Sequence, residues 1–355
     1  MSLKSLFENS PDLKPQHLQA NISVSRLIET MGKTSFEARN LLHGARLFCD
    51  MVQAGDVIWL GIAGAGIAGG MGGYVISLLN AGFIDVICST GAQVYHDLHF
   101  AFDLPVKSIS PDWDDDMLRK HGDTRIYDIG IREVETLQKQ DELIQEFFRD
   151  TRDSFPDEAI SSWQFNYFLG QWVLQKAAHP ERSFVARAAQ LGIPVFWDSH
   201  SNHSIAMNLA KLEDEGLICR LSSTKDILDS AAIVFNSGGT GFIELGGGGP
   251  KNFIQQTGPT ISQILGISFE GADRGIQIGT AMEREGSLSG CTFGEAVTWG
   301  KYHHADADKL VQIWGEYSII FPLLGTYVLE KAKPRKPGNL IKSMPEMAEK
   351  LSAAR

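Results

Sequence analysis

The sequence predicts an α/β fold in which helices cover both faces of a parallel sheet. Three observations support this prediction. Short apolar runs of strand type alternate along the chain with segments of helical periodicity, which is the order of βαβ units. One such run, Val57–Ile62, leads through a glycine-rich turn directly into a helical segment. Hydrophobic residues make up 43% of the 355 residues, which is enough for a large core.

The length of the chain allows two or three average domains, or one large α/β domain. We interpret residues 34–333 as a single α/β domain with a helical insertion at about 112–180. Residues 1–33 are interpreted as an N-terminal arm. Residues 334–355, which contain proline and several lysines, are interpreted as a partly free C-terminal tail.

The individual elements follow from apolar periodicity and from the residues that begin and end each segment. A first helix is predicted over Thr34–Gln53, because Thr34 and Glu37 fit a capping box that satisfies the free N–H groups of a first turn. The predicted strands are Val57–Ile62, Val86–Cys88, Pro194–Trp197, Ala231–Asn236 and Gly275–Ile278, and the other predicted helices are Met71–Leu79, Ile131–Arg149, Glu158–Gln175 and Ser318–Ala332.

Composition and charge limit the classes of function. The net charge of −11 argues against nucleic-acid binding and against attraction to an anionic membrane, and it suits a cationic substrate. The sequence contains no uninterrupted apolar stretch of about 18 residues, so we expect no membrane span. The four cysteines form no C-x-x-C pair and predict a reduced, cytoplasmic protein rather than a disulfide scaffold: Cys49, Cys88, Cys219 and Cys291.

The turn after Val57–Ile62 has the pattern of a nucleotide-binding loop. Residues Gly64–Gly69 fit G-x-G-x-x-G, in which bare backbone and the N–H groups of a helix start approach phosphate. The dinucleotide fingerprint also asks for an acid at the end of the next strand, but that strand ends in Ser89 and Thr90. A tight strand-to-helix turn without a ligand therefore stays open as an alternative.

Two later segments also place polar groups or bare backbone beyond strand ends. Asp198 directly follows a predicted strand, and ligands of open α/β sheets lie beyond the carboxyl ends of strands. His200 and His203 indicate a metal only weakly, because no third ligand is evident, and a polar loop that caps the next helix is the alternative. The four glycines at 246–249 cost conformational entropy, which favours backbone lying against a ligand over a floppy loop.

The segment Glu283–His304 holds the most chemistry. Its carboxylates and the aromatic face of Trp299 suit a cationic amine substrate. A desolvated lysine near other cations loses its proton readily and forms Schiff bases, which makes Lys301 a candidate nucleophile, although an exposed surface lysine is the common alternative. The carboxylates are Glu283, Glu285 and Glu295.

Together these motifs resemble the deoxyhypusine synthase family. The resemblance covers about Leu42 to Lys331 and rests on "LGIAGAGIAGGMGG", "DVICSTGAQVYHDL", "FWDSHSNHS", "ELGGGGPKNF", "EGSLSGCTFGEAVTWGK" and "FPLLGTYV" in this order. It implies a Rossmann-like NAD-binding domain, a homotetramer, and active sites at a dimer interface. It also implies that hydride passes from spermidine to NAD and that the 4-aminobutyl group becomes an imine on a lysine. An acceptor amine then displaces the lysine, and the retained NADH reduces the new imine.

The resemblance assigns roles residue by residue. It implies that Lys301 carries the imine and that Trp299 and Glu295 complete the catalytic group. The implied substrate-binding residues are His203, Asn252, Ser287 and Leu288. The implied cofactor-binding residues are Gly64, Ala65, Gly66, Ser89, Thr90, Asp198, Gly247, Gly249, Glu285 and Glu316. No metal is implied.

The sequence departs from the family pattern at positions that bind the amine. Asn252 stands where the family has a histidine proposed to shuttle a proton, and His203 and Leu288 stand where it has acids. Tyr95 and His96 also occupy positions of two common acids. Losing carboxylate-to-ammonium contacts weakens spermidine binding, so we expect an altered donor, acceptor or both. A true deoxyhypusine synthase acting on the translation factor 5A precursor, and an NAD-binding protein with redirected or lost activity, are the alternatives.

Overall fold

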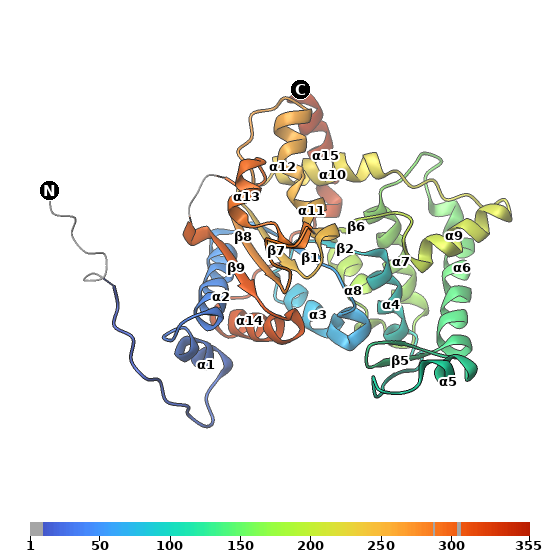
Figure 1. The fold of residues 1–355 in the computed structure, drawn as a ribbon. Coiled ribbons are helices and arrows are strands. Elements are labelled where there is room, and N and C mark those ends of the chain that lie inside the picture. Colours follow the sequence, from blue (N-terminus) through green and yellow to red (C-terminus); the bar gives the residue numbers. More distant parts are fainter. Residues whose placement is uncertain (1–9, 287, 304–306) are drawn as a thin grey trace.

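Six parallel strands form the central sheet in the order β6-β2-β1-β7-β8-β9 (Figure 1). The computed structural model describes residues 10–286, 288–303 and 307–355. In chain order these strands are third, second, first, fourth, fifth and sixth, which is the strand order of dinucleotide-binding folds. The predicted Rossmann-like α/β fold is therefore confirmed. The strands are β1 Val57–Ile62, β2 Val86–Ser89, β6 Val195–Trp197, β7 Thr240–Leu245, β8 Arg274–Gly279 and β9 Leu310–Trp314.

Helices cover both faces of this sheet, as predicted. Alternate residues of β1 enter two separate cores, with Ile58 and Leu60 on one face and Trp59 on the other. Helices α2, α3 and α14 pack on the first face, and α10, α11 and α15 on the second (Figure 1). The helices are α1 Val24–Met31, α2 Glu37–Ala54, α3 Gly72–Asn80, α4 Gly91–Ala101, α5 Asp115–Lys120, α6 Lys139–Thr151, α7 Ser162–Lys176, α8 Phe184–Leu191, α9 Ser204–Asp214, α10 Ser223–Phe235, α11 Gly248–Gln255, α12 Thr257–Pro259, α13 Phe293–Thr298, α14 Tyr317–Lys331 and α15 Leu340–Ala353.

Two predictions about local structure are wrong. Ala231–Asn236 is not a strand, because its apolar residues form the last turns of α10, which packs against α15, α12 and α7. A helix enclosed on several sides is apolar around its axis and mimics a buried strand in sequence. The capping box at Thr34 does not form either. Helix α2 begins at Glu37 after Phe36, whose φ is 62°, and the Glu37 carboxylate instead accepts a hydrogen bond from the Trp314 N–H at 2.8 Å.

The predicted helical insertion begins with a small antiparallel sheet that sequence analysis missed. Strands β3 Val106–Ser108, β4 Asp123–Ile126 and β5 Ile129–Arg132 pair in the order β3-β5-β4. The predicted helix over Ile131–Arg149 is therefore wrong at its start, where two residues belong to β5, and α6 follows a π-helical segment. Residues of this sheet lie opposite the turn that follows the carboxyl end of β1.

Both terminal regions contain helices that pack on the domain. Ile28 of α1 is fully buried, and α1 contacts α2 and α14. Met344 and Leu351 of α15 are buried against α10, so a partly free tail is wrong for this helix. None of the helices in the described part of the chain has the length and apolar character to span a bilayer. The division into domains stays an interpretation.

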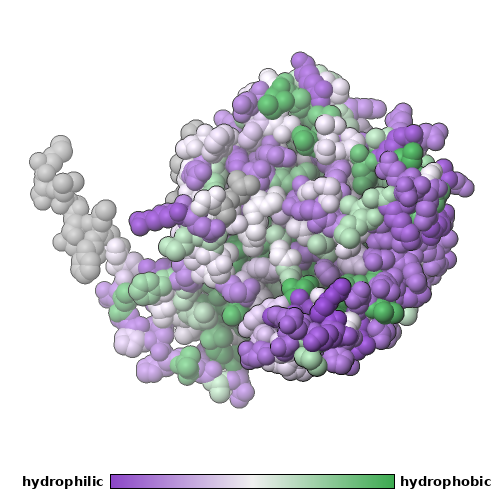
Figure 2. Space-filling view, turned by 45° about the vertical axis from the view of Figure 1, so that its right-hand side comes forward, coloured by the Kyte–Doolittle hydropathy of each residue, from purple (hydrophilic) through white to green (hydrophobic). Residues whose placement is uncertain are grey.

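Hydrophilic side chains dominate the right-hand side of the face drawn in Figure 2. Hydrophobic residues interrupt this face only as small separate patches (Figure 2). Such a distribution is ordinary for a surface in contact with water.

The segment between α14 and α15 is tied to the sheet by a largely buried ion pair. The Arg335 guanidinium pairs with Asp85 and also donates to the backbone oxygens of Gly82 and Asp56. Burial raises the pKa of Asp85, and Arg335 opposes this rise. We expect Arg335→Ala to lower the free energy of unfolding by about 3 kcal/mol, because it leaves a buried carboxylate without its partner. Urea unfolding measures this loss, and the exposed neighbouring Lys336→Ala serves as the control.

Candidate active site

The glycine-rich turn follows β1 at the point where the strand order reverses. There the chain leaves β1 through α3 and reaches β2 on one side, whereas β7, the neighbour of β1 on the other side, leads into α11. Gly64 has a φ of 79°, which favours glycine. The Tyr317 hydroxyl accepts a hydrogen bond from the Gly66 N–H and donates one to the Ala63 oxygen, both at 2.9 Å. Tyr317, which sequence analysis missed, therefore holds the turn from the first residue of α14.

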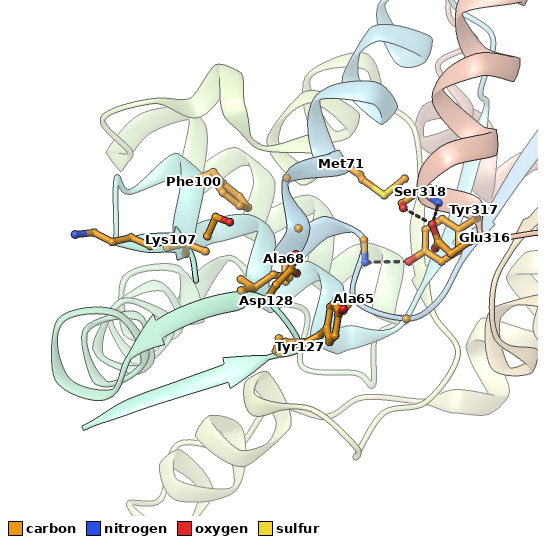
Figure 3. A pocket seen from close by; sticks show the side chains of 18 residues that line it. Ala65, Ala68, Met71, Phe100, Lys107, Tyr127, Asp128, Glu316, Tyr317 and Ser318 are labelled. Atoms are coloured by element: carbon orange, nitrogen blue, oxygen red, sulfur yellow. Dashed lines mark hydrogen bonds between the residues drawn. The ribbon is translucent and has the colours of Figure 1, made fainter. Parts of the chain in front are cut away.

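A cavity of about 590 Å³ opens beside this turn (Figure 3). The turn, the small antiparallel sheet and the start of α14 form its walls. Four predicted cofactor-binding residues line it, namely Gly64, Ala65, Gly66 and Glu316. Glu316 also caps α14, with its carboxylate accepting from the Ser318 N–H at 2.9 Å. Sequence analysis missed the lining residues from the small sheet, including Lys107, Tyr127 and Asp128.

The four-glycine stretch is an ordered turn into α11 rather than a floppy loop. Gly246 has a φ of 77°, and Gly247 is the N-cap of α11. A Cβ atom on Gly249 would lie 2.0 Å from Oδ2 of Asp198. The predicted residues Asp198, Gly247 and Gly249 therefore come together at one place, beside the N-terminus of α11. Burial raises the pKa of Asp198 to about 6, and its Oδ1 atom is buried without a hydrogen-bond partner in the described structure.

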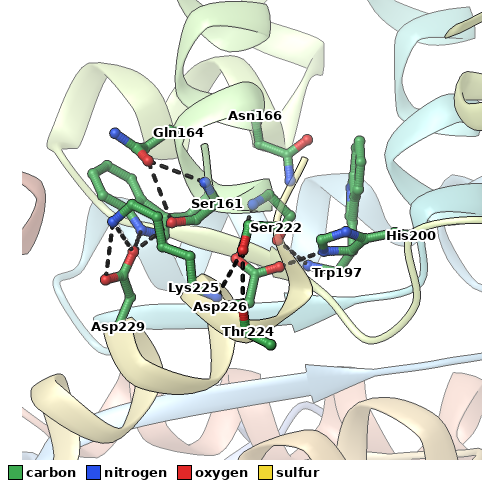
Figure 4. Close-up of polar contacts among 12 residues, drawn as sticks. Ser161, Gln164, Asn166, Trp197, His200, Ser222, Thr224, Lys225, Asp226 and Asp229 are labelled. Atoms are coloured by element: carbon green, nitrogen blue, oxygen red, sulfur yellow. Dashed lines mark hydrogen bonds and ion pairs between the residues drawn. The ribbon is translucent and has the colours of Figure 1, made fainter. Parts of the chain in front are cut away.

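The loop that carries Asp198 is anchored by its two histidines. His200 Nε2 lies 2.5 Å from the buried Asp226 carboxylate, which also accepts from the Ser162 N–H at the start of α7 (Figure 4). His203 caps α9, because its Nδ1 accepts from the Ala206 N–H. Burial lowers the pKa of His203 to about 4, so the ring is neutral at neutral pH. Both histidines thus support the polar-loop alternative.

The end of α13 explains the spacing of Trp299, Gly300 and Lys301. The Gly300 N–H donates to the Val297 oxygen and the Lys301 N–H to the Ala296 oxygen, which is the pattern of a Schellman cap. This cap needs a left-handed residue, and Gly300 has a φ of 68°. The cap turns the chain away from the helix, and the Lys301 ammonium reaches Asn252 Oδ1 of α11 at 3.1 Å.

The other two predicted catalytic residues face outward. The Trp299 side chain is 63% exposed, and Glu295 is exposed in the first turn of α13. Thr292 caps this helix, with its hydroxyl accepting from the Glu295 N–H. In the single chain, therefore, Lys301 and Asn252 lie in contact, whereas Trp299 and Glu295, which precede Lys301 in the chain, are exposed.

The positions of the remaining predicted residues say little about a role in binding. Ser89 is buried at the end of β2, and Thr90 caps α4 by accepting from the Gln93 N–H. Glu285 is exposed. Leu288 begins a short 3-10 turn, and Ser287 lies outside the described residues. Roles for these residues in binding stay predictions.

Sequence analysis missed a buried polar cluster behind Lys301. The Glu244 carboxylate, 2% exposed, accepts from the Tyr302 hydroxyl at 2.8 Å and from Gln255 Nε2 at 2.7 Å. Lys251 is 3% exposed, and its ammonium donates to the Cys291 oxygen at 2.7 Å. A glutamate inside the apolar run of β7 was the available signal, since buried carboxylates are rare.

Comparison with known proteins shows which family this chain is similar to. A sequence model of the family described as deoxyhypusine synthase matches residues 26–328. The "Deoxyhypusine synthase-like protein" of Nostoc sp. is 32% identical over 348 residues, covering 96% of this chain and 90% of the relative. The "Probable deoxyhypusine synthase 2" of Methanosarcina mazei is 34% identical over 330 residues, covering 93% of this chain and 92% of the relative.

A solved structure assigned to a deoxyhypusine synthase of Entamoeba histolytica matches with a TM-score of 0.58 at 15% identity. The match covers 89% of this chain and 96% of that chain. At this identity the likeness concerns the fold, and it agrees with the parallel sheet described above. The family model and the two relatives span nearly the whole domain. The chain belongs to the deoxyhypusine synthase family.

Proposed function

We propose that this protein is an NAD-dependent transferase that moves an aminoalkyl group from a polyamine or related amine to an amine acceptor through an imine on Lys301. The observation that carries this proposal is the placement of Lys301 by the Schellman cap against Asn252, in a chain of the deoxyhypusine synthase family. A lysine that merely follows a helix would not need a hydrogen-bond partner on α11, the helix that begins in the four-glycine stretch.

The residues at the switch point fit NAD. The cavity beside the glycine turn has the volume of a small-molecule site, and the bare backbone of the turn leaves room for phosphate. Gly64, Ala65, Gly66 and Glu316 would hold the cofactor, with Asp198 at the neighbouring helix start. Bound NAD would supply a hydride acceptor for oxidising a C–N bond of the substrate to an imine.

Residues of the chain itself would form the imine and bind the ammonium group of the substrate. The Lys301 amine forms the new C=N bond to the substrate carbon, and the shorter amine leaves. Trp299 offers an aromatic face and Glu295 a carboxylate for the ammonium group of the substrate. Asn252 accepts a hydrogen bond from Lys301 and orients it, but its amide does not take up a proton at neutral pH.

We infer that the amine differs from spermidine in charge or length. His203 is neutral and occupied in capping α9, so it does not replace a carboxylate as a partner for ammonium. A true deoxyhypusine synthase would need these ammonium contacts from elsewhere. A donor with fewer cationic groups fits the residues at hand better.

Reductive trapping tests the proposed function. The protein is incubated with NAD and, separately, with spermidine, putrescine or agmatine, and the mixture is reduced with borohydride. We expect a mass increase on the peptide that contains Lys301 with one of these amines. Bound NAD without an adduct from any amine would contradict the transferase proposal and favour an NAD-binding protein with redirected or lost activity.

Asp198 gives the proposed cofactor site a pH dependence. Burial raises its pKa to about 6, so the carboxylate is ionised above pH 6 and protonated below it. If the ionised form accepts a hydrogen bond from the cofactor, NAD affinity falls as the pH drops through about 6. We expect Asp198→Asn to bind NAD more weakly and with a flat profile between pH 5 and 8, as titration calorimetry measures. A flat profile in the unchanged protein would remove Asp198 from the site.

We further propose a cytoplasmic homotetramer with active sites at a dimer interface. The 63% exposure of Trp299 in the single chain supports an arrangement in which a second copy covers it. The four cysteines are free thiols, as in a reducing compartment. Light scattering after size-exclusion chromatography measures the mass, and a monomer would contradict this assembly.

A further inference from the structure

Glu244 is the most deeply buried carboxylate near the candidate nucleophile. It lies near the carboxyl end of β7, and the alternation along this strand turns it toward the core that contains Phe242 and Tyr302. Its two hydrogen bonds, from Tyr302 and Gln255, both reach Oε1. The Oε2 atom is buried and has no partner in the described structure. Burying a carboxylate with half of its acceptors unused is costly, which points to a role other than stability.

The groups around Glu244 connect it to Lys301 from two sides. Tyr302, which donates to the carboxylate, directly follows Lys301 in the chain. Gln255 lies on α11, less than one turn beyond Asn252, which accepts from the Lys301 ammonium. The backbone of this segment is also fixed, because the Ala272 N–H donates to the Lys301 oxygen at 3.0 Å. The carboxylate thus accepts hydrogen bonds from Tyr302, which follows Lys301, and from Gln255 of α11. The contact between Lys301 and Asn252 joins these same two segments.

Lys251 brings a second cation into the same place. Its ammonium donates to the backbone oxygen of Cys291, in the loop before α13, and is otherwise enclosed. Burial lowers the pKa of Lys251, and the Glu244 carboxylate opposes this fall. In turn, burial raises the pKa of Glu244, and Lys251, Tyr302, Gln255 and Lys301 oppose that rise. The Glu244 carboxylate therefore favours the charged form of Lys251, and Lys251 favours the charged form of Glu244.

We propose that Glu244 is a positioning residue that acts through Tyr302 and Gln255, and that it is the buried counter-charge which sets how readily the Lys251–Lys301 pair gives up protons. This proposal rests on the proposed function in taking Lys301 as the imine-forming amine. The titratable groups that face the carboxylate are Lys251 from α11 and Lys301 and Tyr302 beyond α13, with Cys291 and Glu295 facing Lys251. Glu244 is 2% exposed, so we place it beneath the surface that a substrate would contact and assign it no direct contact with the reacting groups.

The negative charge of Glu244 determines in which direction the pH dependence of the Lys301 amine should move when that charge is removed. An amine forms an imine only when it has lost its proton, and a nearby carboxylate stabilises the protonated form. Glu244→Gln keeps the shape and an acceptor oxygen but removes the negative charge. The acid limb of the pH–rate profile should therefore move to lower pH, by about one unit. Glu244→Asp keeps the charge and should leave the limb close to that of the unchanged protein.

Reductive methylation of Lys301 by formaldehyde and cyanoborohydride measures this effect without any amine substrate. The peptide mass is read after fixed times across pH 5 to 10, for the unchanged protein, Glu244→Gln and Glu244→Asp. We expect half-maximal labelling at lower pH in Glu244→Gln alone. An unmoved midpoint in a folded Glu244→Gln protein, with only a lower melting temperature, would reduce Glu244 to a structural residue and overturn the proposal.

A substitute variant covers a failure to fold, and the labelling result can be separated from the proposed function. If Glu244→Gln does not fold, Tyr302→Phe replaces it. This variant removes one donor that stabilises the ionised carboxylate, so the midpoint should move in the same direction by a smaller amount, and no movement overturns the proposal. The labelling also separates this inference from the proposed function. A shifted midpoint in a protein that transfers no group from any amine would sustain the role of Glu244 and reject the transferase.

Discussion

Replacing Lys301 with alanine is expected to abolish group transfer, with a loss in kcat of at least about 10³-fold. The alanine cannot form the covalent C=N bond, and no described neighbour can substitute for it. Asn252 has no nucleophilic amine, and Lys251 is 3% exposed with its ammonium directed at the Cys291 oxygen. Product formation from the trapped donor amine, followed by mass spectrometry, measures the loss. The borohydride adduct should disappear in the same variant.

Matched variants distinguish loss of the amine from loss of structure. Lys301→Arg keeps a cation that can donate to Asn252, but guanidinium does not form the imine, so it should be as inactive as alanine. Lys333→Ala removes an exposed lysine after α14 and should retain full activity. NAD binding should survive in Lys301→Ala, because Lys301 does not line the cavity beside the glycine turn. Full turnover by Lys301→Ala would refute the covalent route.

The parts of the fold that sequence could predict are those with strong local signals. Strand β1 matches its predicted bounds, because five of its six residues are buried and a glycine turn fixes its end. The small antiparallel sheet escaped prediction because its strands are only three or four residues long and β3 and β4 hold successive polar residues, so pairing across β3, β5 and β4 rather than a local pattern defines them. The strand-like run in α10 misled for the opposite reason, since the enclosed last turns of this helix are apolar on all sides.

In the candidate site, too, features with a local sequence signal could be predicted and features that depend on distant contacts could not. The glycine turn after β1 and the ordered four-glycine stretch could be predicted, because each needs the glycines that the sequence displays. The partners of these features could not. Tyr317 lies more than 250 residues from the turn it holds, and Glu244 meets Tyr302 across 58 residues. Such pairs depend on strand order, which local periodicity does not determine.

Gly66→Ala is expected to weaken NAD binding by at least about tenfold, equivalent to about 1.4 kcal/mol. A Cβ atom at this position would lie 2.7 Å from the Tyr317 hydroxyl and 2.9 Å from the Met71 sulfur. The turn must then move, and the hydrogen bonds that Tyr317 makes to Gly66 and Ala63 lengthen or break. The N–H groups that would face phosphate lose their fixed direction. Calorimetric titration with NAD measures the change.

Two further variants show whether the clash with Tyr317 causes this loss. Gly73→Ala places a methyl group at the second residue of α3 with no heavy atom within 4 Å, so it should bind NAD as the unchanged protein does. Adding Tyr317→Phe to Gly66→Ala removes the nearest atom and should restore part of the affinity. The restoration stays partial, because the phenylalanine makes neither hydrogen bond. Undiminished binding by Gly66→Ala alone would show that NAD does not rest on this turn, and the cavity beside it would then have to serve another ligand.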